Sequence, residues 1–381
     1  MINIKELKNI KHIYAIDIGR EYSYIVDVRQ FMSSKNCEVK KIKTSELIDF
    51  IKSHKGKVAI FYEQSGIYSL KLDILNSNSI IKYTINGKEF RGLRLASNKK
   101  KNDLNDVKII AKSVSDLLLY NESDYLTKFH EPLPYECKKL RRLLRFYEQL
   151  VKQSQKIKNK INNFYWLLLG KSKKIDYISK STKEKILKLL ELEDEINGIY
   201  GDEIKFLLEI YDYYFNKANE IKLEIEEIIK NHPDYPKLKK VFEGKLLIAH
   251  LIATYWDINR FNSIKQFKAL FKFHFVKVLK SGKTQKIEKT IKVKNIKRYF
   301  YLLLLHTKNP QIRKLWNYYK KIRKLSRAKA FTKFSYVLVS MIYKYLKGEE
   351  FKLPEGIEKA FKKWNGDDPP NRIGTSFGWS H

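Results

Sequence analysis

The sequence predicts a mixed α/β domain in the first third of the chain, then a helical middle, then a mostly helical and strongly basic last third. Two patterns indicate this order. Up to about residue 125, short apolar runs of strand length alternate with helical stretches. Beyond that point, apolar residues recur at helical spacing over tens of positions. The 381-residue chain is 43% hydrophobic, which is enough for two or three separate cores.

Five strands are expected in the first region. Residues 12–18 and 21–28 are rich in β-forming side chains and flank a tight turn, which indicates a hairpin. Residues 38–42 are a third candidate. Residues 57–62 form an apolar run typical of a strand buried on both faces, and a fifth strand is expected near residues 80–84.

Three helices are expected between and after these strands, over residues 44–53, from about residue 68, and over residues 103–120. The order is then three strands, helix, strand, helix, strand, helix. This is the element order of a ribonuclease-H-like domain, which we place at residues 1–125.

The middle region, residues 126–235, carries two long apolar repeats. Residues 137–169 contain neither glycine nor proline, and apolar positions there step by three and four. A sustained 3.5-residue repeat indicates a coiled coil. The two runs could pair as an antiparallel hairpin or between subunits. The repeat positions are Leu140, Leu143, Tyr147, Leu150, Ser154, Ile157, Ile161, Phe164 and Leu168, then Ile204, Leu207, Tyr211, Tyr214, Ala218, Ile221, Ile225 and Ile228.

Pro233 and Pro236 end the middle region, because closely spaced prolines stop a helix. Residues 236–365 are expected to form a helical basic domain that a lysine-rich stretch, residues 277–294, interrupts. Residues 366–381 show no periodicity and are expected to be a disordered tail whose last three residues could come from cloning. The helices expected here cover residues 245–255, 264–271, 296–306, 310–325 and 328–346.

Charge points to a nucleic-acid partner. The chain has 77 Lys and Arg against 42 Asp and Glu, a net charge of +35 that no fold requires and that opposes compaction. Its two cysteines, Cys37 and Cys137, exclude a disulfide scaffold and a zinc ribbon. The longest apolar runs fall far short of the ~20 residues of a membrane span, and no apolar signal segment opens the chain. We therefore expect a cytoplasmic protein that binds nucleic acid and no membrane.

Four acidic residues occupy positions that suit metal binding. Asp17 ends the first expected strand, and Glu63 ends the buried fourth one. Asp103 and Asp106 are three apart and so share one face of a helix. Carboxylate oxygens from strand ends and a helix face could hold two divalent cations. Taken singly, each residue could equally be a turn or cap residue.

The segments around these acids resemble the signature segments of the DEDD transposases of insertion-sequence family 110 and of related site-specific DNA invertases. Asp17 lies in Ile-Asp-Ile-Gly, Glu63 in Glu-Gln-Ser-Gly-Ile-Tyr, and Asp103 with Asp106 in Lys-Asn-Asp-Leu-Asn-Asp-Val. The resemblance implies a Holliday-junction-resolvase-like (RuvC-like) ribonuclease H fold, with the four carboxylates catalytic and binding Mg²⁺ (or Mn²⁺). It also implies a coiled coil after this domain.

The resemblance extends to a candidate nucleophile in the basic last region. That family carries a Ser-Gly segment whose serine attacks DNA, and Ser281 occupies this place. A phosphoserine ester would conserve the broken bond for rejoining. Ser281 could instead be a turn residue in a basic loop. The family's Pro-Gly-Ile-Gly turn is reduced here to Gly244, and its Gly-Asn pair to Asn295.

Lysines and arginines near these candidate residues are expected to hold phosphates, which gives affinity without sequence choice. The resemblance implies donor and target DNA and a structured guide RNA as partners. A homo-oligomer, dimer or tetramer, is expected because strand exchange needs more than one active site. The expected nucleic-acid contacts are Lys99, Lys100, Lys101, Lys280, Lys283, Lys297 and Arg298.

The first interpretation is a DNA transposase or site-specific recombinase with a metal site and a serine nucleophile. Two alternatives stay open. One is a metal-dependent, junction-resolving nuclease that uses water and not Ser281. The other is a catalytically idle nucleic-acid-binding scaffold, against which the four intact acids argue.

Overall fold

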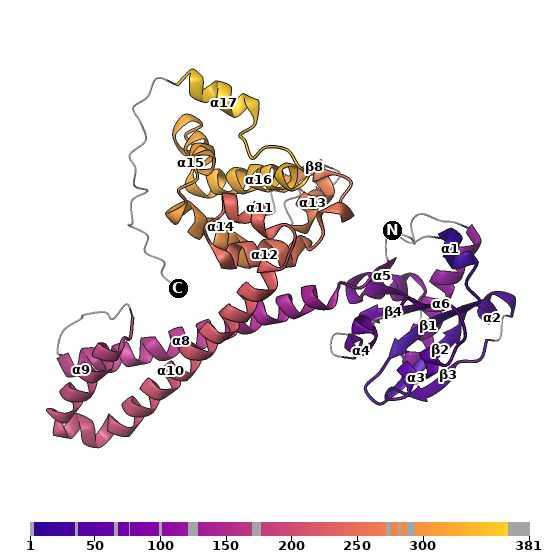
Figure 1. Ribbon diagram of the computed structural model, residues 1–381, viewed down its shortest axis with the longest axis horizontal. Coiled ribbons are helices and arrows are strands. Elements are labelled where there is room, and N and C mark those ends of the chain that lie inside the picture. The colour runs from indigo at the N-terminus through magenta and orange to yellow at the C-terminus, as the bar shows by residue number, and fades with distance from the viewer. Residues whose placement is uncertain are drawn as a thin grey trace. The chain divides into compact units, whose positions relative to one another are not determined.

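The computed structural model describes residues 4–34, 37–64, 68–75, 77–98, 101–120, 129–169, 177–271, 276–280, 283–287 and 294–364. The chain forms two compact units, Met1–Tyr135 and Glu136–His381, whose elements Figure 1 labels. The units meet between residues 135 and 136, whereas the predicted first domain ends at residue 125, and that boundary stays a prediction. The further predicted boundary at residue 235 lies inside the second unit and stays a prediction.

The first unit is built on a six-stranded sheet of order β3-β2-β1-β4-β5-β6. β1 and β4 are parallel at its centre, and β5 continues the parallel arrangement, whereas β2, β3 and β6 are antiparallel to their neighbours. The five expected strands are all present, and this mixed sheet is compatible with a ribonuclease-H-like fold. The bounds are β1 His12–Ile18, β2 Tyr22–Asp27, β3 Lys40–Lys43, β4 Val58–Gln64, β5 Ile80–Asn86 and β6 Phe129–His130.

Alternating side chains give the sheet two apolar faces, each covered by helices. Ala15 and Phe61 belong to one core cluster, whereas Ile16 and Tyr62 belong to the other. The first face packs against α1 (Ile4–Lys8), α2 (Val28–Ser33), α5 (Gly87–Ala96) and α6 (Asp103–Tyr120). The second packs against α3 (Leu47–Lys52) and α4 (Leu70–Ile74). Helices α1, α2 and α5 and strand β6 were not among the elements that the sequence predicted.

Two long helices open the second unit, α8 (Tyr135–Leu169) and α10 (Asp194–Lys230), with α9 (Lys180–Glu191) between them in the chain. They lie side by side in Figure 1. Ile161 and Leu168 near the end of α8 share a core cluster with Ile204 near the start of α10, so the helices run antiparallel. The repeat positions therefore pack within one chain, and supercoiling of the pair stays a prediction.

The remaining helices pack around α12, whose residues from Leu247 to Ala253 are all buried. Leu140 of α8 and Ile225 of α10 join the same core, which ties the helix pair to this bundle. In the lysine-rich interruption, β7 and β8 pair as an antiparallel hairpin. The bounds are α11 Tyr235–Val241, α12 Lys245–Tyr255, η1 Ile258–Arg260, α13 Ile264–Leu270, β7 Val276–Lys280, β8 Lys283–Ile287, α14 Lys294–His306, α15 Pro310–Asn317, the π-helical η2 Tyr318–Ile322, α16 Arg327–Leu346 and α17 Glu355–Lys362.

The helices of this bundle agree with those expected, except that the sequence did not predict α11, α17 or the hairpin. Residues 366–381, expected to be a tail, lie outside the described residues. In the part of the chain that the structure describes, no helix combines the length and apolar character needed to cross a membrane.

Candidate active site

Asp17 and Glu63 are neighbours at the ends of two parallel strands. The last paired residues of β1 and β4 are Ile16 and Tyr62, so the next step in register places Asp17 beside Glu63. Ile16 and Tyr62 face the α3–α4 side of the sheet. Because side chains alternate along a strand, the two carboxylates face the opposite side, which α6 covers.

Helix α6 brings the other two carboxylates to the same end of the sheet. Asn102 precedes the helix and accepts hydrogen bonds from the Asn105 and Asp106 backbone amides, through its side chain at 2.7 Å and its carbonyl at 2.9 Å. Asn102, and not Asp103, is therefore the cap of this helix. Val107 and later apolar residues of α6 pack on the sheet, so Asp106 is buried while Asp103 is exposed.

The other three carboxylates lie close enough to Asp17 for their charges to act on it. Burial, followed by the negative charges of Asp106, Asp103 and Glu63, raises the pKa of Asp17 to about 7. Burial also raises the pKa of Glu63; the positive charges of Arg94 and Lys101 oppose this shift, and the charge of Asp106 adds to it. Both burial and neighbouring negative charge therefore disfavour the ionised form of Asp17.

A basic residue that the sequence reasoning missed lies in this group. Arg94 of α5 donates from Nε to Asp106 Oδ1 and from Nη2 to Asp106 Oδ2, each at 2.7 Å. Its guanidinium also lies 4.9 Å from the centre of the Phe90 ring. The sequence holds a weak signal for it, since Phe90 and Arg94 are four apart on one helix face.

Comparison with known families assigns the first part of the chain to a family. Residues 15–166 match the family of DEDD transposases of insertion-sequence family 110, described as a transposase. This part of the chain belongs to that transposase family. The match contains Asp17, Glu63, Asp103 and Asp106, and so confirms the resemblance carried by their segments. The comparison with curated proteins found no match.

The transposase site has the donor chemistry for a divalent cation. Four carboxylates supply hard oxygen ligands, which Mg²⁺ and Mn²⁺ prefer. Burial first, and then the negative charges of the other three carboxylates, raise the pKa of Asp17. Among the described residues, however, no three His, Cys, Asp or Glu side chains converge tightly enough to hold a metal ion. The expected ligands share one end of the sheet, with both oxygens of Asp106 engaged by Arg94.

Two glycines near this site occupy positions where a side chain would not fit without a shift of neighbouring atoms, one in the turn after β1 and one beside Glu63. Gly19 follows Asp17 at the β1–β2 turn, where a Cβ atom would collide with the Tyr22 carbonyl oxygen. Gly87 begins α5, and a Cβ there would lie 2.9 Å from Glu63 Oε1. A side chain at Gly87 would therefore press on the carboxylate of Glu63. The sequence interpretation assigned no role to Gly87.

The remaining predicted site residues are distributed over both units. Ser281, Lys99 and Lys100 lie outside the described residues. Lys101 is exposed, and its charge acts on Glu63. In the second unit, Lys280 and Lys283 pair through the backbones of β7 and β8, and both Lys297 and Arg298 are exposed on the first turns of α14.

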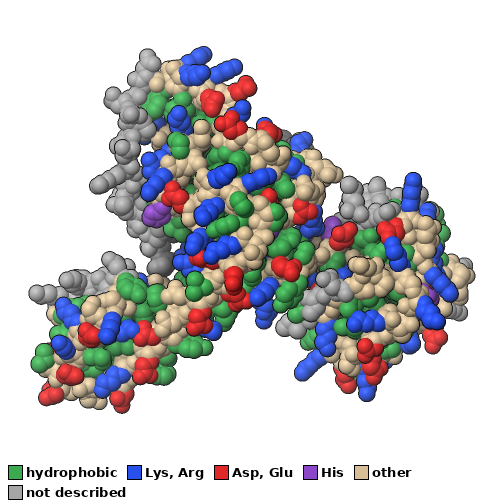
Figure 2. Space-filling view, viewed as in Figure 1, with side chains coloured by type: hydrophobic (Ala, Val, Ile, Leu, Met, Phe, Trp, Pro, Cys, Tyr) green, Lys and Arg blue, Asp and Glu red, His purple; other side chains and the backbone are tan. Residues whose placement is uncertain are grey.

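Basic residues dominate the C-terminal helices of the second unit. Residues 289–348 contain 17 Lys and Arg and no Asp or Glu, whereas α10 carries ten acidic and four basic residues. Figure 2 shows blue Lys and Arg side chains spread over the C-terminal helices and red acidic ones along α10. The C-terminal helices thus present the surface better suited to a phosphate backbone.

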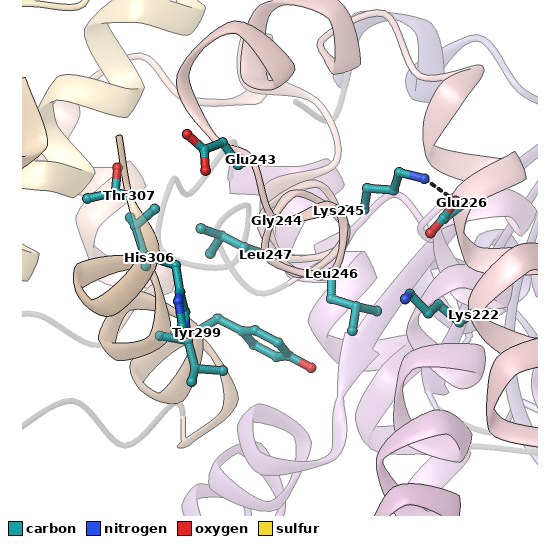
Figure 3. Close-up of a pocket in the computed structure, with 12 residues that line it drawn as sticks. Lys222, Glu226, Glu243, Gly244, Lys245, Leu246, Leu247, Tyr299, His306 and Thr307 are labelled. Carbon is teal, nitrogen blue, oxygen red and sulfur yellow. Dashed lines mark hydrogen bonds and ion pairs between the residues drawn. The ribbon is translucent and has the colours of Figure 1, made fainter. Parts of the chain in front are cut away.

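The second unit also contains a cavity of about 440 Å³ between the ends of α10, α12 and α14 (Figure 3). Gly244 lines it, as do Tyr299 and His306 of α14. An ion pair of 2.6 Å between Lys245 and Glu226 borders it. Because acidic and basic side chains alternate around this cavity, its lining does not select an anion or a cation.

Proposed function

We propose that the chain cuts and rejoins DNA through a composite site, in which Asp17, Glu63, Asp103 and Asp106 hold Mg²⁺ or Mn²⁺ and Ser281 is the nucleophile. The single observation that carries the proposal is that the charges of Glu63, Asp103 and Asp106 act on Asp17 at one end of the sheet, inside the matched transposase segment. The bound cation would stabilise negative charge on the reacting phosphate.

In the proposed reaction, the hydroxyl oxygen of Ser281 forms a bond to phosphorus while the bond from phosphorus to a deoxyribose oxygen breaks. The proton of the serine leaves its oxygen, and the departing deoxyribose oxygen takes up a proton. The phosphodiester is stored as a phosphoserine ester, so a second deoxyribose hydroxyl can reverse the step and join new strands. No external energy source is needed.

Donor and target DNA are the proposed substrates, with a structured guide RNA choosing the sequence. Exposed Lys101, Lys297 and Arg298 support phosphate contacts, as does the acid-free stretch of the C-terminal helices. Such contacts do not discriminate between bases, and base pairing with a guide would supply that choice. We further propose a dimer or tetramer, because rejoining two duplexes requires several active sites.

The test uses the purified full chain with its copurifying RNA, labelled DNA carrying the element ends, and Mg²⁺. Denaturing gels should show DNA attached covalently to the protein. Ser281→Ala should abolish the adduct, whereas Ser326→Ala should retain it. Ser326 is a suitable control because it is an exposed serine of the same unit whose hydroxyl makes no capping hydrogen bond.

A second candidate function is a metal-dependent nuclease that uses water. The observation that favours it is the division of the chain, since all four carboxylates lie in the first unit and Ser281 in the second. Cleavage without an adduct, unchanged in Ser281→Ala and lost in Asp17→Asn, would establish this function and remove Ser281 from the mechanism.

A further inference from the structure

Arg94 occupies a position that neither the family match nor the mechanism explains. Its side chain is 17% exposed, and that of its partner Asp106 is 6% exposed. The two parallel hydrogen bonds of 2.7 Å use both carboxylate oxygens. This bidentate, largely buried geometry is the strong form of an arginine–carboxylate pair, unlike an exposed surface pair of little consequence.

The local structure holds the guanidinium in place. The ring of Phe90, fully buried in the core, lies one turn earlier on α5 and stacks with the guanidinium. The backbone carbonyl of Arg94 accepts a hydrogen bond of 2.8 Å from the Ser97 hydroxyl. Asn98 follows in the left-handed region, at φ 50°, and ends the helix there. The packing of Phe90 and the hydrogen-bonded end of α5 therefore hold Arg94 beside Asp106.

The charge of Arg94 reaches beyond its direct partner. It is the leading positive charge acting on Glu63, and it also acts on Asp17. Arg94 thus contacts one of the four candidate metal ligands, and its positive charge acts on two more. A divalent cation bound among these carboxylates would neutralise the same negative charges.

We propose that Arg94 is a built-in counter-ion of the transposase metal site, which pairs with Asp106 when no cation is bound and releases at least one Asp106 oxygen when a cation binds. This inference rests on the proposed metal site. Arg94 acts through Asp106 and is therefore a positioning residue.

Two physical effects make the arginine and the metal compete. An oxygen that accepts a hydrogen bond from Arg94 offers less electron density, and a less accessible lone pair, to a cation. A guanidinium beside a divalent cation is also repelled by it, and this repulsion is strong where water is scarce. Arg94 thus lowers the affinity of the site for metal, and it occupies the Asp106 oxygens until a cation binds.

The test is Mn²⁺ binding by the full chain freed of nucleic acid, followed by the electron paramagnetic resonance signal of free Mn²⁺. Arg94→Gln should lower the dissociation constant about tenfold, within the usual range of coupling between sites. In EDTA the variant should unfold at a lower temperature than wild type, and Mn²⁺ should raise its unfolding temperature by more. Arg91→Gln, which removes an exposed arginine of the same helix, should change neither quantity.

Arg94→Lys keeps the charge but cannot bridge both Asp106 oxygens, so this variant should bind Mn²⁺ with an affinity between those of wild type and Arg94→Gln. It also provides a test if Arg94→Gln folds poorly. Folded variants that bind Mn²⁺ no more tightly than wild type would overturn the proposal. Binding by wild type that is lost in Asp17→Asn supports the metal site whatever the Arg94 variants show. If neither wild type nor the Arg94 variants bind Mn²⁺, the metal site and this proposal both fail.

Discussion

The two units of the chain handle charge in opposite ways. The first gathers four carboxylates at one end of a sheet and partly neutralises them with Arg94. The second carries a stretch of 60 residues, 289–348, with 17 basic residues and no acidic one. Buried like charges cost free energy unless a counter-ion is present. An exposed basic surface costs less because water solvates it, and it attracts a polyanion.

The negative charge at the end of the sheet therefore needs a counter-ion within the first unit. The positive charge of the basic helices is instead neutralised when a polyanion binds. Bare carboxylates would repel the DNA that the basic helices attract. Charge compensation at the carboxylates, by Arg94 or by a bound cation, removes this conflict.

The largest effect is expected from Asp106→Ala. It removes a candidate metal ligand and leaves the Arg94 guanidinium largely buried without its partner, so DNA cleavage should be lost. The free energy of unfolding should also fall by roughly 3–5 kcal/mol, because an uncompensated buried charge is costly. Denaturant unfolding and a cleavage assay measure the two quantities. A stable but inactive Asp106→Ala protein would show that the ion pair contributes little.

The basic surface is tested by replacing Lys314, Arg323, Lys324 and Lys329 with Gln. All four are exposed. Affinity for nucleic acid should fall about tenfold or more at low salt, and the slope of log K against log salt should decrease by about 0.9 for each duplex phosphate that the protein no longer neutralises. The matched control replaces the four lysines of α10, where acids prevail. An equal effect in both variants would contradict the difference between the two regions.

Asp17→Asn should stabilise the metal-free protein at pH 8. The pKa of Asp17 is raised to about 7 in the folded state, so the folded protein holds this proton more tightly than the unfolded chain, whose aspartates titrate near 4. Stability is therefore lost as pH rises from about 4 to 7. The variant should gain on the order of 1–2 kcal/mol at pH 8 after allowance for solvent screening.

The gain should disappear near pH 4, where Asp17 is protonated in both states. Urea unfolding at the two pH values measures it. A variant less stable than wild type at pH 8 would mean that Asp17 makes favourable contacts that outweigh repulsion by its neighbours.

The smallest effect concerns two glycines of α5. Gly87→Ala places a methyl group 2.9 Å from Glu63 Oε1; the carboxylate can move, so stability should change by less than about 1 kcal/mol. Mn²⁺ binding should nevertheless weaken several-fold, because a ligand is displaced. Gly92→Ala meets no atom within 4 Å and should stabilise the helix by about 0.5–1 kcal/mol. Unchanged Mn²⁺ binding in Gly87→Ala would remove Glu63 from the metal site.

Much of the first unit could be predicted because its signals are local. β1 agrees with the expected residues 12–18, and α6 agrees with 103–120. Helix α5 was missed even though Asn86 caps it by accepting from the Lys88 and Glu89 amides; without a clear apolar run, its capping signal was overlooked. The hairpin of β7 and β8 was missed because its lysines suggested a loop, although apolar residues alternate with polar ones in β7.

The sequence by itself determined the positions of the first five strands along the chain, the long helical repeats, the four acidic residues in their family segments and the basic excess. Periodicity, spacing and composition carry these properties along short stretches of chain. Only the tertiary structure decided that Asp17 lies beside Glu63, that Gly87 leaves room for Glu63, and that Arg94 neutralises Asp106. These contacts join residues that strand register and helix packing bring together, and no local pattern encodes such proximity.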